Sequence, residues 1–296
     1  MNTEPYKGVR DFYPPEMATQ NYIFSVWRKV AEKFGYVEYS ASILEYAELY
    51  RNKGSDEIVN EQMYLFKDKG DREVALRPEM TPTLARMIAA KRRTLKFPLR
   101  WYSIPNVFRY ERPQRGRRRE HWQLNCDLMG IAGIEAEVEI IKLAHDIMNE
   151  FGGKDSDFEI RINSRKIINA VLAGKNFSED QIRDFTRKLD KGDLPTNIHF
   201  EPDEEIKKLL AVLKETGINN VRFDETLARG FDYYTGMVFE VFDTNLENRR
   251  ALFGGGRYDN LLEMFGVEPI PTVGFGMGDV TIQDFLVTHN LPLKNK

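Results

Sequence analysis

The chain has 296 residues, of which 42% are hydrophobic and 30% charged, so it carries enough apolar material for a packed core. Its formal net charge of −3 excludes a globally basic nucleic-acid-binding surface, and its single cysteine, Cys126, excludes an internal disulfide framework and a Cys₄ or Cys₂His₂ zinc site. The polar N-terminus and the lack of any run near ~18 apolar residues exclude a secretory signal and a membrane span, so we expect a cytoplasmic protein.

The predicted elements mix helices and strands without regular βαβ alternation. Apolar residues at three- and four-residue steps predict helices over residues 17–34, 78–93 and 135–151. Strands are predicted over residues 36–39, 99–103, 106–110, 123–129, 158–162, 221–223 and 237–242. The Lys- and Asp-rich stretch 164–220 is predicted to be an inserted helical subdomain. This pattern favours an α+β fold with mainly antiparallel strands flanked by helices, and disfavours a doubly wound Rossmann sheet.

An arginine-rich stretch spans residues 108–119 and is predicted to be a loop between two strands, because it contains Pro113 and Gly116. Its six arginines suit phosphate, carboxylate or a nucleic-acid backbone, since guanidinium groups donate paired hydrogen bonds. A solvated basic loop without a ligand is the alternative.

Two other segments carry groups that could recognise a small polar molecule. Residues 227–236 place Tyr233 and Tyr234 between two glycines, with Arg229 directly before the first of them, and an apolar strand follows. The alternative is a turn with packed tyrosines. Glu79 and Thr81 stand at the predicted start of a helix, where capping would explain them and a ligand ammonium would also fit.

Glycine clusters occur at residues 254–256 and 274–278. The first lacks the Gly-Lys-Ser/Thr ending of a Walker loop, and a tight turn between strands is favoured over a phosphate cradle. The second follows no βαβ unit, so close helix–strand packing is favoured over a dinucleotide motif. Four scattered histidines without metal-ligand spacing disfavour a transition-metal site, and no nucleophile elbow supports hydrolase chemistry.

The order of these segments resembles the histidyl-tRNA synthetase family over residues 7 to about 286, most specifically in Arg-Gly-Phe-Asp-Tyr-Tyr-Thr-Gly and the later Gly-Gly-Gly-Arg-Tyr-Asp. The resemblance implies a class II synthetase catalytic fold, with a six- or seven-stranded antiparallel sheet, in a homodimer. It implies a catalytic core of residues 1–163 and 221–296 and a helical insertion at 164–220. The family's C-terminal anticodon-binding domain is expected to be absent.

The implied reaction joins L-histidine to ATP, releases pyrophosphate, and transfers histidine to tRNA(His). By the resemblance, Arg109 and Arg229 flank the α-phosphate as the catalytic pair. Glu111 holds the adenine amino group, Arg117 the outer phosphates, and His121 takes the position facing the adenine ring. Magnesium would bind through the phosphates of ATP, with no protein metal ligands expected.

The resemblance also assigns an amino-acid pocket. Glu79, Thr81 and Gln123 match the positions around the α-amino group of histidine. Asp127, Tyr234 and Tyr258 match those around the imidazole, with Tyr233 beside them. A site of this kind rejects isosteres because buried polar groups would lose their partners.

Three positions depart from the family pattern. Thr281 replaces the arginine of the third motif, His121 replaces a phenylalanine, and a proline expected near Ser42 is missing. A histidine-binding paralogue without catalysis, like the regulatory subunit of ATP phosphoribosyltransferase, is therefore the alternative function. The intact Arg229 segment and arginine loop favour the ligase. A protein that only binds RNA would leave the tyrosine pocket without a purpose.

Overall fold

A nine-stranded mixed sheet forms the centre of the computed structural model, which describes residues 2–51, 58–190, 192, 198–248 and 250–294. The strand order is β1-β5-β7-β12-β11-β10-β8-β9, and β6 pairs with β7. The six central strands from β5 to β8 are antiparallel, while β1 and β9 pair in parallel at the two ends. The predicted α+β class is confirmed, and the expected six or seven strands are exceeded by these additions.

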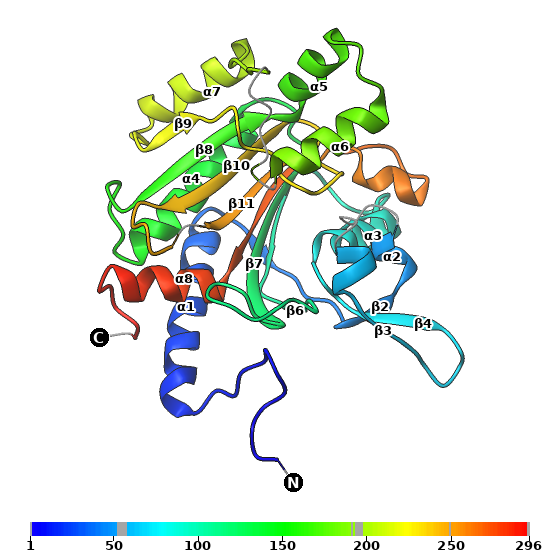
Figure 1. The fold of residues 1–296 in the computed structure, drawn as a ribbon, viewed down its shortest axis with the longest axis vertical. Coiled ribbons are helices and arrows are strands. Elements are labelled where there is room, and N and C mark those ends of the chain that lie inside the picture. Colours follow the sequence, from blue (N-terminus) through cyan, green and yellow to red (C-terminus); the bar gives the residue numbers. More distant parts are fainter. Residues whose placement is uncertain (1, 52–57, 191, 193–197, 249, 295–296) are drawn as a thin grey trace.

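The nine strands of this sheet are β1 (Val37–Glu38), β5 (Leu99–Ser103), β6 (Asn106–Phe108), β7 (Glu120–Met129), β8 (Phe158–Ser164), β9 (Val221–Phe223), β10 (Met237–Asp243), β11 (Ala251–Arg257) and β12 (Thr272–Gly278). A smaller sheet of order β2-β4-β3 projects from the body (Figure 1) and consists of β2 (Leu44–Tyr46), β3 (Tyr64–Lys67) and β4 (Glu73–Leu76). The helices are α1 (Pro14–Lys33), α2 (Glu48–Arg51), α3 (Thr81–Lys91), α4 (Glu135–Glu150), α5 (Arg165–Gly174), α6 (Glu179–Asp190), α7 (Glu204–Glu215) and α8 (Asp279–Thr288), with a π-helical turn η1 (Ile58–Gln62) and a 3₁₀ turn η2 (Leu261–Phe265).

The three helices predicted by periodicity are present as α1, α3 and α4. Helix α3 begins three residues later than predicted, with Pro82 in its first turn, where a missing N–H costs no hydrogen bond. The capping interpretation of Glu79 and Thr81 is wrong, because the N-cap is Met80 and no side chain caps this helix.

The triple glycine lies inside a central strand, so the predicted turn there is wrong. Gly254 pairs with Gly276 and Gly256 pairs with Gly274 across β11 and β12, in the middle of the sheet. At Gly274 and Gly276 of the second glycine cluster, the predicted helix–strand packing role is also wrong. A Cβ on Gly274 would lie 2.5 Å from Asp127 Oδ1, and one on Gly276 would lie 2.8 Å from the Gln123 amide. These glycines make room for polar side chains of β7.

Strand β7 places alternate side chains on the two faces of the sheet. Leu124, Cys126 and Leu128 are fully buried in the core cluster that also contains residues of α1 and α4. The alternate residues, Gln123, Asn125 and Asp127, point to the opposite face, because successive side chains of a strand alternate. One strand therefore supplies both the apolar support and part of the site.

Helices α5, α6 and α7 occupy most of the stretch between β8 and β9, along the upper side of the sheet in Figure 1. Buried residues of all three, such as Ile168, Phe185 and Leu209, belong to the same core cluster as the sheet. Residues 191 and 193–197 of the predicted insertion lie outside the described residues. No helix within the described ranges has the length and apolar character of a bilayer span.

A buried ion pair fixes the end of β11 to α4. The Arg257 guanidinium donates from two nitrogens to Glu137, the second bond measuring 2.6 Å, and the two side chains are only 4% and 3% exposed. The same guanidinium donates to the carbonyl oxygens of Ile131 and Gly133. The loop before α4 therefore depends on this one arginine.

Removing the acid of this pair should strongly destabilise the fold. We expect Glu137→Ala to lower the free energy of unfolding by about 3–5 kcal/mol, because the buried arginine then keeps only the partly exposed Asp259 as an acidic partner. Urea unfolding at neutral pH measures the loss. Glu150→Ala removes an exposed pair with Lys29 and should cost less than about 1 kcal/mol. Equal losses in the two variants would contradict this account.

Candidate active site

Two connected cavities open on the polar face of the central strands. The glycines of β11 and β12 form their floor, where side chains would fill the space: a Cβ on Gly254 would lie 2.6 Å from Arg229 Nη1. The inner cavity is small, and the outer cavity has a volume of about 770 Å³, within the range of ligand sites. Arg109, Gln123 and Arg229 line both cavities and stand at their junction.

The inner cavity brings together every residue predicted for the amino-acid pocket. Glu79 and Thr81 come from the start of α3, two side chains come from β7, and the aromatic groups come from the loop before β10 and the end of β11. The predicted residues lining it are Glu79, Thr81, Gln123, Asp127, Tyr233, Tyr234 and Tyr258. These residues are up to 179 positions apart in the sequence, so only the fold assembles them.

Asp127 and Tyr258 form a buried polar pair in this cavity. The Tyr258 hydroxyl donates to Asp127 Oδ1, and both residues are 4% exposed. Burial raises the pKa of the Asp127 carboxyl to about 7, against the smaller opposing effect of the tyrosine hydroxyl. A carboxyl balanced between its two protonation states, beside a hydroxyl, suits a ligand with ring N–H groups.

Glu79 is the second buried acid of the inner cavity. Tyr233 donates its hydroxyl to Glu79 Oε2 at 3.3 Å, while the buried Oε1 atom has no hydrogen-bond partner. Burial raises the pKa of Glu79 to about 7, although the positive charges of Arg109 and Arg229 act in the opposite direction. An unpartnered buried oxygen of this kind fits a ligand that donates hydrogen bonds, such as an ammonium group.

Arginines dominate the junction of the two cavities. Arg229 has 17% of its side chain exposed and donates from Nη1 to Glu240 Oε1 at 2.6 Å. Desolvation opposes its charge, but the nearby Tyr234 and Glu240 raise its pKa above the ordinary value, so it stays cationic. Arg109 is oriented by the bond from its Nε to the Pro78 carbonyl oxygen at 2.9 Å, which leaves its terminal nitrogens toward the cavities.

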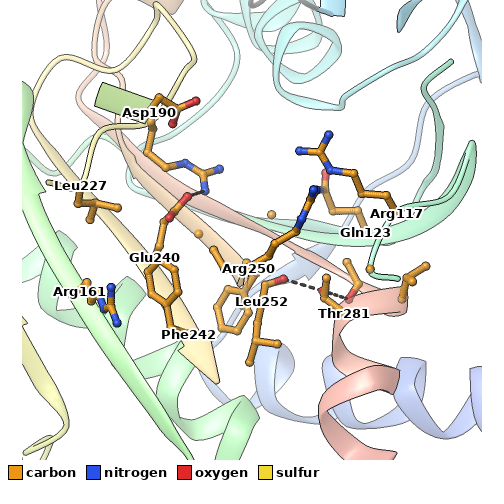
Figure 2. A pocket seen from close by; sticks show the side chains of 18 of the residues that line it. Arg117, Gln123, Arg161, Asp190, Leu227, Glu240, Phe242, Arg250, Leu252 and Thr281 are labelled. Atoms are coloured by element: carbon orange, nitrogen blue, oxygen red, sulfur yellow. Dashed lines mark hydrogen bonds and ion pairs between the residues drawn. The ribbon is translucent and has the colours of Figure 1, made fainter. Parts of the chain in front are cut away.

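The outer cavity holds the groups predicted for the nucleotide. Figure 2 shows Arg117, Gln123, Arg250 and Thr281 around it, and its predicted lining residues are Arg109, Glu111, Arg117, His121 and Arg229. The loop that carries Arg117 turns at Gly116, which has a φ of 74°, and Arg117 Nε lies 3.2 Å from Glu111 Oε2. The predicted loop between β6 and β7 is therefore confirmed.

The comparisons with known proteins agree with this arrangement. The family model described as "Histidyl-tRNA synthetase" matches residues 8–201 and 197–280. A histidine–tRNA ligase of Leptospira biflexa is 44% identical over 98% of this chain and 76% of its own length. One from Thermoplasma volcanium is 38% identical over 95% of this chain and 74% of its own length.

The chain belongs to the histidyl-tRNA synthetase family. Among solved structures, a Bacillus halodurans protein described as an ATP phosphoribosyltransferase regulatory subunit/histidyl-tRNA synthetase has a TM-score of 0.83 at 26% identity, and covers 96% of this chain and 84% of its own. The apo histidyl-tRNA synthetase of S. aureus has the same fold, with a TM-score of 0.74 at 24% identity, over 99% of this chain and 72% of its own. The class II catalytic fold implied by the sequence is therefore shown.

Two of the three departures from the family pattern, Thr281 and His121, lie on the outer cavity. Thr281 donates its hydroxyl to the Leu252 carbonyl oxygen at 2.6 Å. Its side chain therefore makes a backbone hydrogen bond and does not provide the positive charge of the arginine that it replaces. Burial, followed by the charges of Arg109 and Arg10, lowers the pKa of His121 to about 3. The imidazole is neutral at physiological pH and presents an uncharged aromatic face.

Sequence reasoning missed several polar lining residues. Asn125 stands between Gln123 and Asp127 on the same face of β7, and the period of two in a strand would have found it. Glu240, the partner of Arg229, faces the outer cavity from β10. Asp190 reaches that cavity from α6, and no sequence motif marks it. Within the described part of the chain, no group of three or more His, Cys, Asp or Glu side chains is placed to hold a metal ion.

The raised pKa of Asp127 predicts a pH-dependent cost to stability. Between its unfolded value near 3.8 and its folded value of about 7, the unfolded chain binds fewer protons, so stability falls as pH rises through this window. Asp127→Asn removes the charge, and we expect it to stabilise the ligand-free protein relative to wild type by roughly 2–4 kcal/mol more at pH 8 than at pH 4.

Urea unfolding of both proteins across this pH range measures the difference. Asp71→Asn, at an exposed carboxylate that pairs with Lys67, is the control and should show no such rise through neutral pH. A difference between wild type and Asp127→Asn that stays constant with pH would show that the buried carboxyl does not titrate in this window.

Proposed function

We propose that this protein is a histidine–tRNA ligase, which activates L-histidine with ATP and transfers it to tRNA(His). The observation that carries the proposal is the junction of the cavities. A small pocket with buried acids and tyrosines opens into a larger arginine-lined cavity, and Arg109, Gln123 and Arg229 line both. An amino acid in the first and a nucleotide in the second would meet at the two arginines.

The chemistry requires positive charge at this junction. When the histidine carboxylate attacks the α-phosphate, negative charge grows on the phosphate oxygens. Arg109 and Arg229 are fixed by Pro78 and Glu240 before any ligand arrives, so they stabilise that charge without reorganisation. Positioning both reactants in adjoining cavities also removes much of the entropic barrier.

Selection of histidine would depend on the buried pairs of the inner cavity. Glu79, with Thr81 and Gln123, would take the α-ammonium group, and Oε1 of Glu79 is the free acceptor. Asp127 and Tyr258, with Tyr234 beside them, would hold the two ring nitrogens, and Tyr233 supports Glu79. An amino acid without those nitrogens would leave the buried pair unsatisfied, so no editing step is needed.

ATP would bind as substrate in the outer cavity. Glu111 would meet the adenine amino group, Arg117 the outer phosphates, and His121 the face of the base. Arg117, Arg118 and Arg250 face the outer cavity, and its carboxylates form no group of three within the described ranges that could hold a metal ion, which fits a Mg²⁺ ion carried by the nucleotide. The ion would neutralise the β- and γ-phosphate oxygens.

Macromolecular partners belong to the same proposal. Arg115, Arg117 and Arg118 surround the tip of the β6–β7 loop at the mouth of the outer cavity, where they would meet tRNA phosphates. Exposed Leu44, Tyr46, Leu65 and Phe66 on the small sheet fit a contact between two copies in a homodimer. Residues 164–220 would be the insertion in a catalytic core of 1–163 and 221–296, acting in the cytoplasm.

The second candidate is a histidine-binding regulatory protein without ligase activity. The similarity to the Bacillus halodurans protein favours it, as does Thr281 at the position of the third-motif arginine. Such a protein would need the inner cavity but would have no use for an arginine pair at the junction. The presence of both Arg109 and Arg229 there favours the ligase.

ATP–pyrophosphate exchange without tRNA tests the proposal. We expect exchange with histidine only, and loss of at least about 10³-fold in Arg229→Ala, because its charge acts on the transition state. Histidine binding by that variant, measured by calorimetry, should stay within a few fold of wild type. Arg183→Ala, an exposed arginine on α6, is the matched control. Histidine binding by the wild type without any exchange would establish the regulatory alternative.

The proposed tRNA contacts predict a steep salt response. If the loop arginines bind phosphates, kcat/KM for tRNA should fall steeply and linearly with salt on logarithmic axes. Arg118→Ala should reduce the slope by about one, since one phosphate contact is lost. Steady-state aminoacylation at several salt concentrations gives the slope, and the exchange reaction reports effects on activation alone. A flat response of kcat/KM would remove the loop from tRNA binding.

A further inference from the structure

The loop that carries Arg229 is held by helices α5 and α6. The guanidinium of Arg165, the first residue of α5, donates to the Arg229 carbonyl oxygen at 3.4 Å, and its backbone N–H donates to the Gly236 carbonyl oxygen at 2.9 Å. From α6, Arg187 Nη2 lies 2.8 Å from Asp232 Oδ2. Both ends and the middle of the loop are therefore tied to these helices.

Asp190, the last residue of α6, lies beside Gly230, the residue that follows Arg229. Its carboxylate lies against the Gly230 backbone, and the charges of Arg229 and Glu240 both act on it. Figure 2 shows Asp190 and Glu240 on the same side of the outer cavity. Since Glu240 is bonded to Arg229, the guanidinium and the adjacent backbone each have an acidic neighbour.

The glycine at position 230 allows the Asp190 carboxylate to come close to the loop backbone. It is absent from the described glycines with a positive φ, so its backbone conformation does not require glycine. A Cβ at this position would lie 2.5 Å from Asp190 Oδ2. The missing side chain is what allows the carboxylate of α6 to reach the loop backbone.

We propose that Asp190 is a positioning residue for Arg229: its carboxylate holds the loop at Gly230, and so couples the end of α6 to the placement of the guanidinium. The expected effect of Asp190 on catalysis rests on the proposed ligase function. Asp190 acts through the loop and takes no part in the chemistry itself. Replacing Asp190 should leave the cavities intact but loosen Arg229, whose guanidinium would meet the negative charge that grows on the α-phosphate.

A double-mutant cycle in the full chain tests this coupling. We expect Asp190→Ala to lower kcat of histidine-dependent exchange roughly 5- to 10-fold, about the net worth of one ordinary hydrogen bond, with KM for histidine unchanged. Gly230→Ala should cause a similar loss by displacing the carboxylate. In the double variant the losses should not multiply, because the alanine methyl then has no oxygen to displace. Losses that multiply would overturn the proposal.

Two further variants separate positioning from general damage to α6. Asp190→Asn keeps an acceptor oxygen and should retain most of kcat. Asp184→Asn removes an exposed acid that pairs with Lys188 on the same helix, and should have no effect. Equal losses in Asp190→Asn and Asp190→Ala, or a loss in Asp184→Asn, would contradict a role through the Gly230 N–H.

Hydrogen–deuterium exchange gives a readout that does not depend on activity. Peptides covering residues 228–236 should exchange several fold faster in Asp190→Ala than in wild type, while peptides of α1 and α4 remain unchanged. Unchanged protection of the loop would overturn the proposal even if the enzyme is active. Faster loop exchange in a chain with no pyrophosphate exchange would support the positioning role and reject the ligase function separately.

Discussion

The alternation of side chains along the central antiparallel strands is the constraint on which the rest of the structure depends. In β7, one set of residues is fully buried against α1 and α4, and the set between them lines the site. A shift of register by one residue would exchange the two sets, so the core that stabilises the sheet also fixes which side chains face the ligands.

Glycines keep the ligand-facing side of the central strands free of side chains. The paired glycines of β11 and β12 leave a floor without side chains, over which Gln123, Asp127 and Arg229 can lie. Glycine in a strand weakens it by lost packing and higher backbone entropy. This cost is tolerated here because both strands have hydrogen-bonded neighbours on each side, so the space is gained inside a sheet that remains intact.

Acidic and basic groups occupy different parts of the cavities above that floor. Two acids with raised pKa values are buried in the inner cavity, and permanently cationic arginines stand at its exit. The acids are paired with tyrosine hydroxyls, which lessens the cost of burying them, while the arginines are fixed by Pro78 and Glu240. The helices beyond the sheet complete this arrangement, since α5 and α6 hold the loop that carries Arg229.

The sequence by itself determined the fold class, the three periodic helices, the arginine loop between β6 and β7, and the family, because each depends on local periodicity or on short segments in a fixed order. It also gave the residues of both cavities through the resemblance. Only the tertiary structure decided that Gly254 and Gly256 lie within a central strand, that β2, β3 and β4 form a sheet of their own, and that Asn125, Asp190 and Glu240 join the site. A glycine run locally favours a turn, and no local signal shows that the face of a strand must stay clear. A lone acid at a helix end likewise carries no signal of what it will touch. Those outcomes depend on contacts between segments far apart in the chain, which no local pattern records.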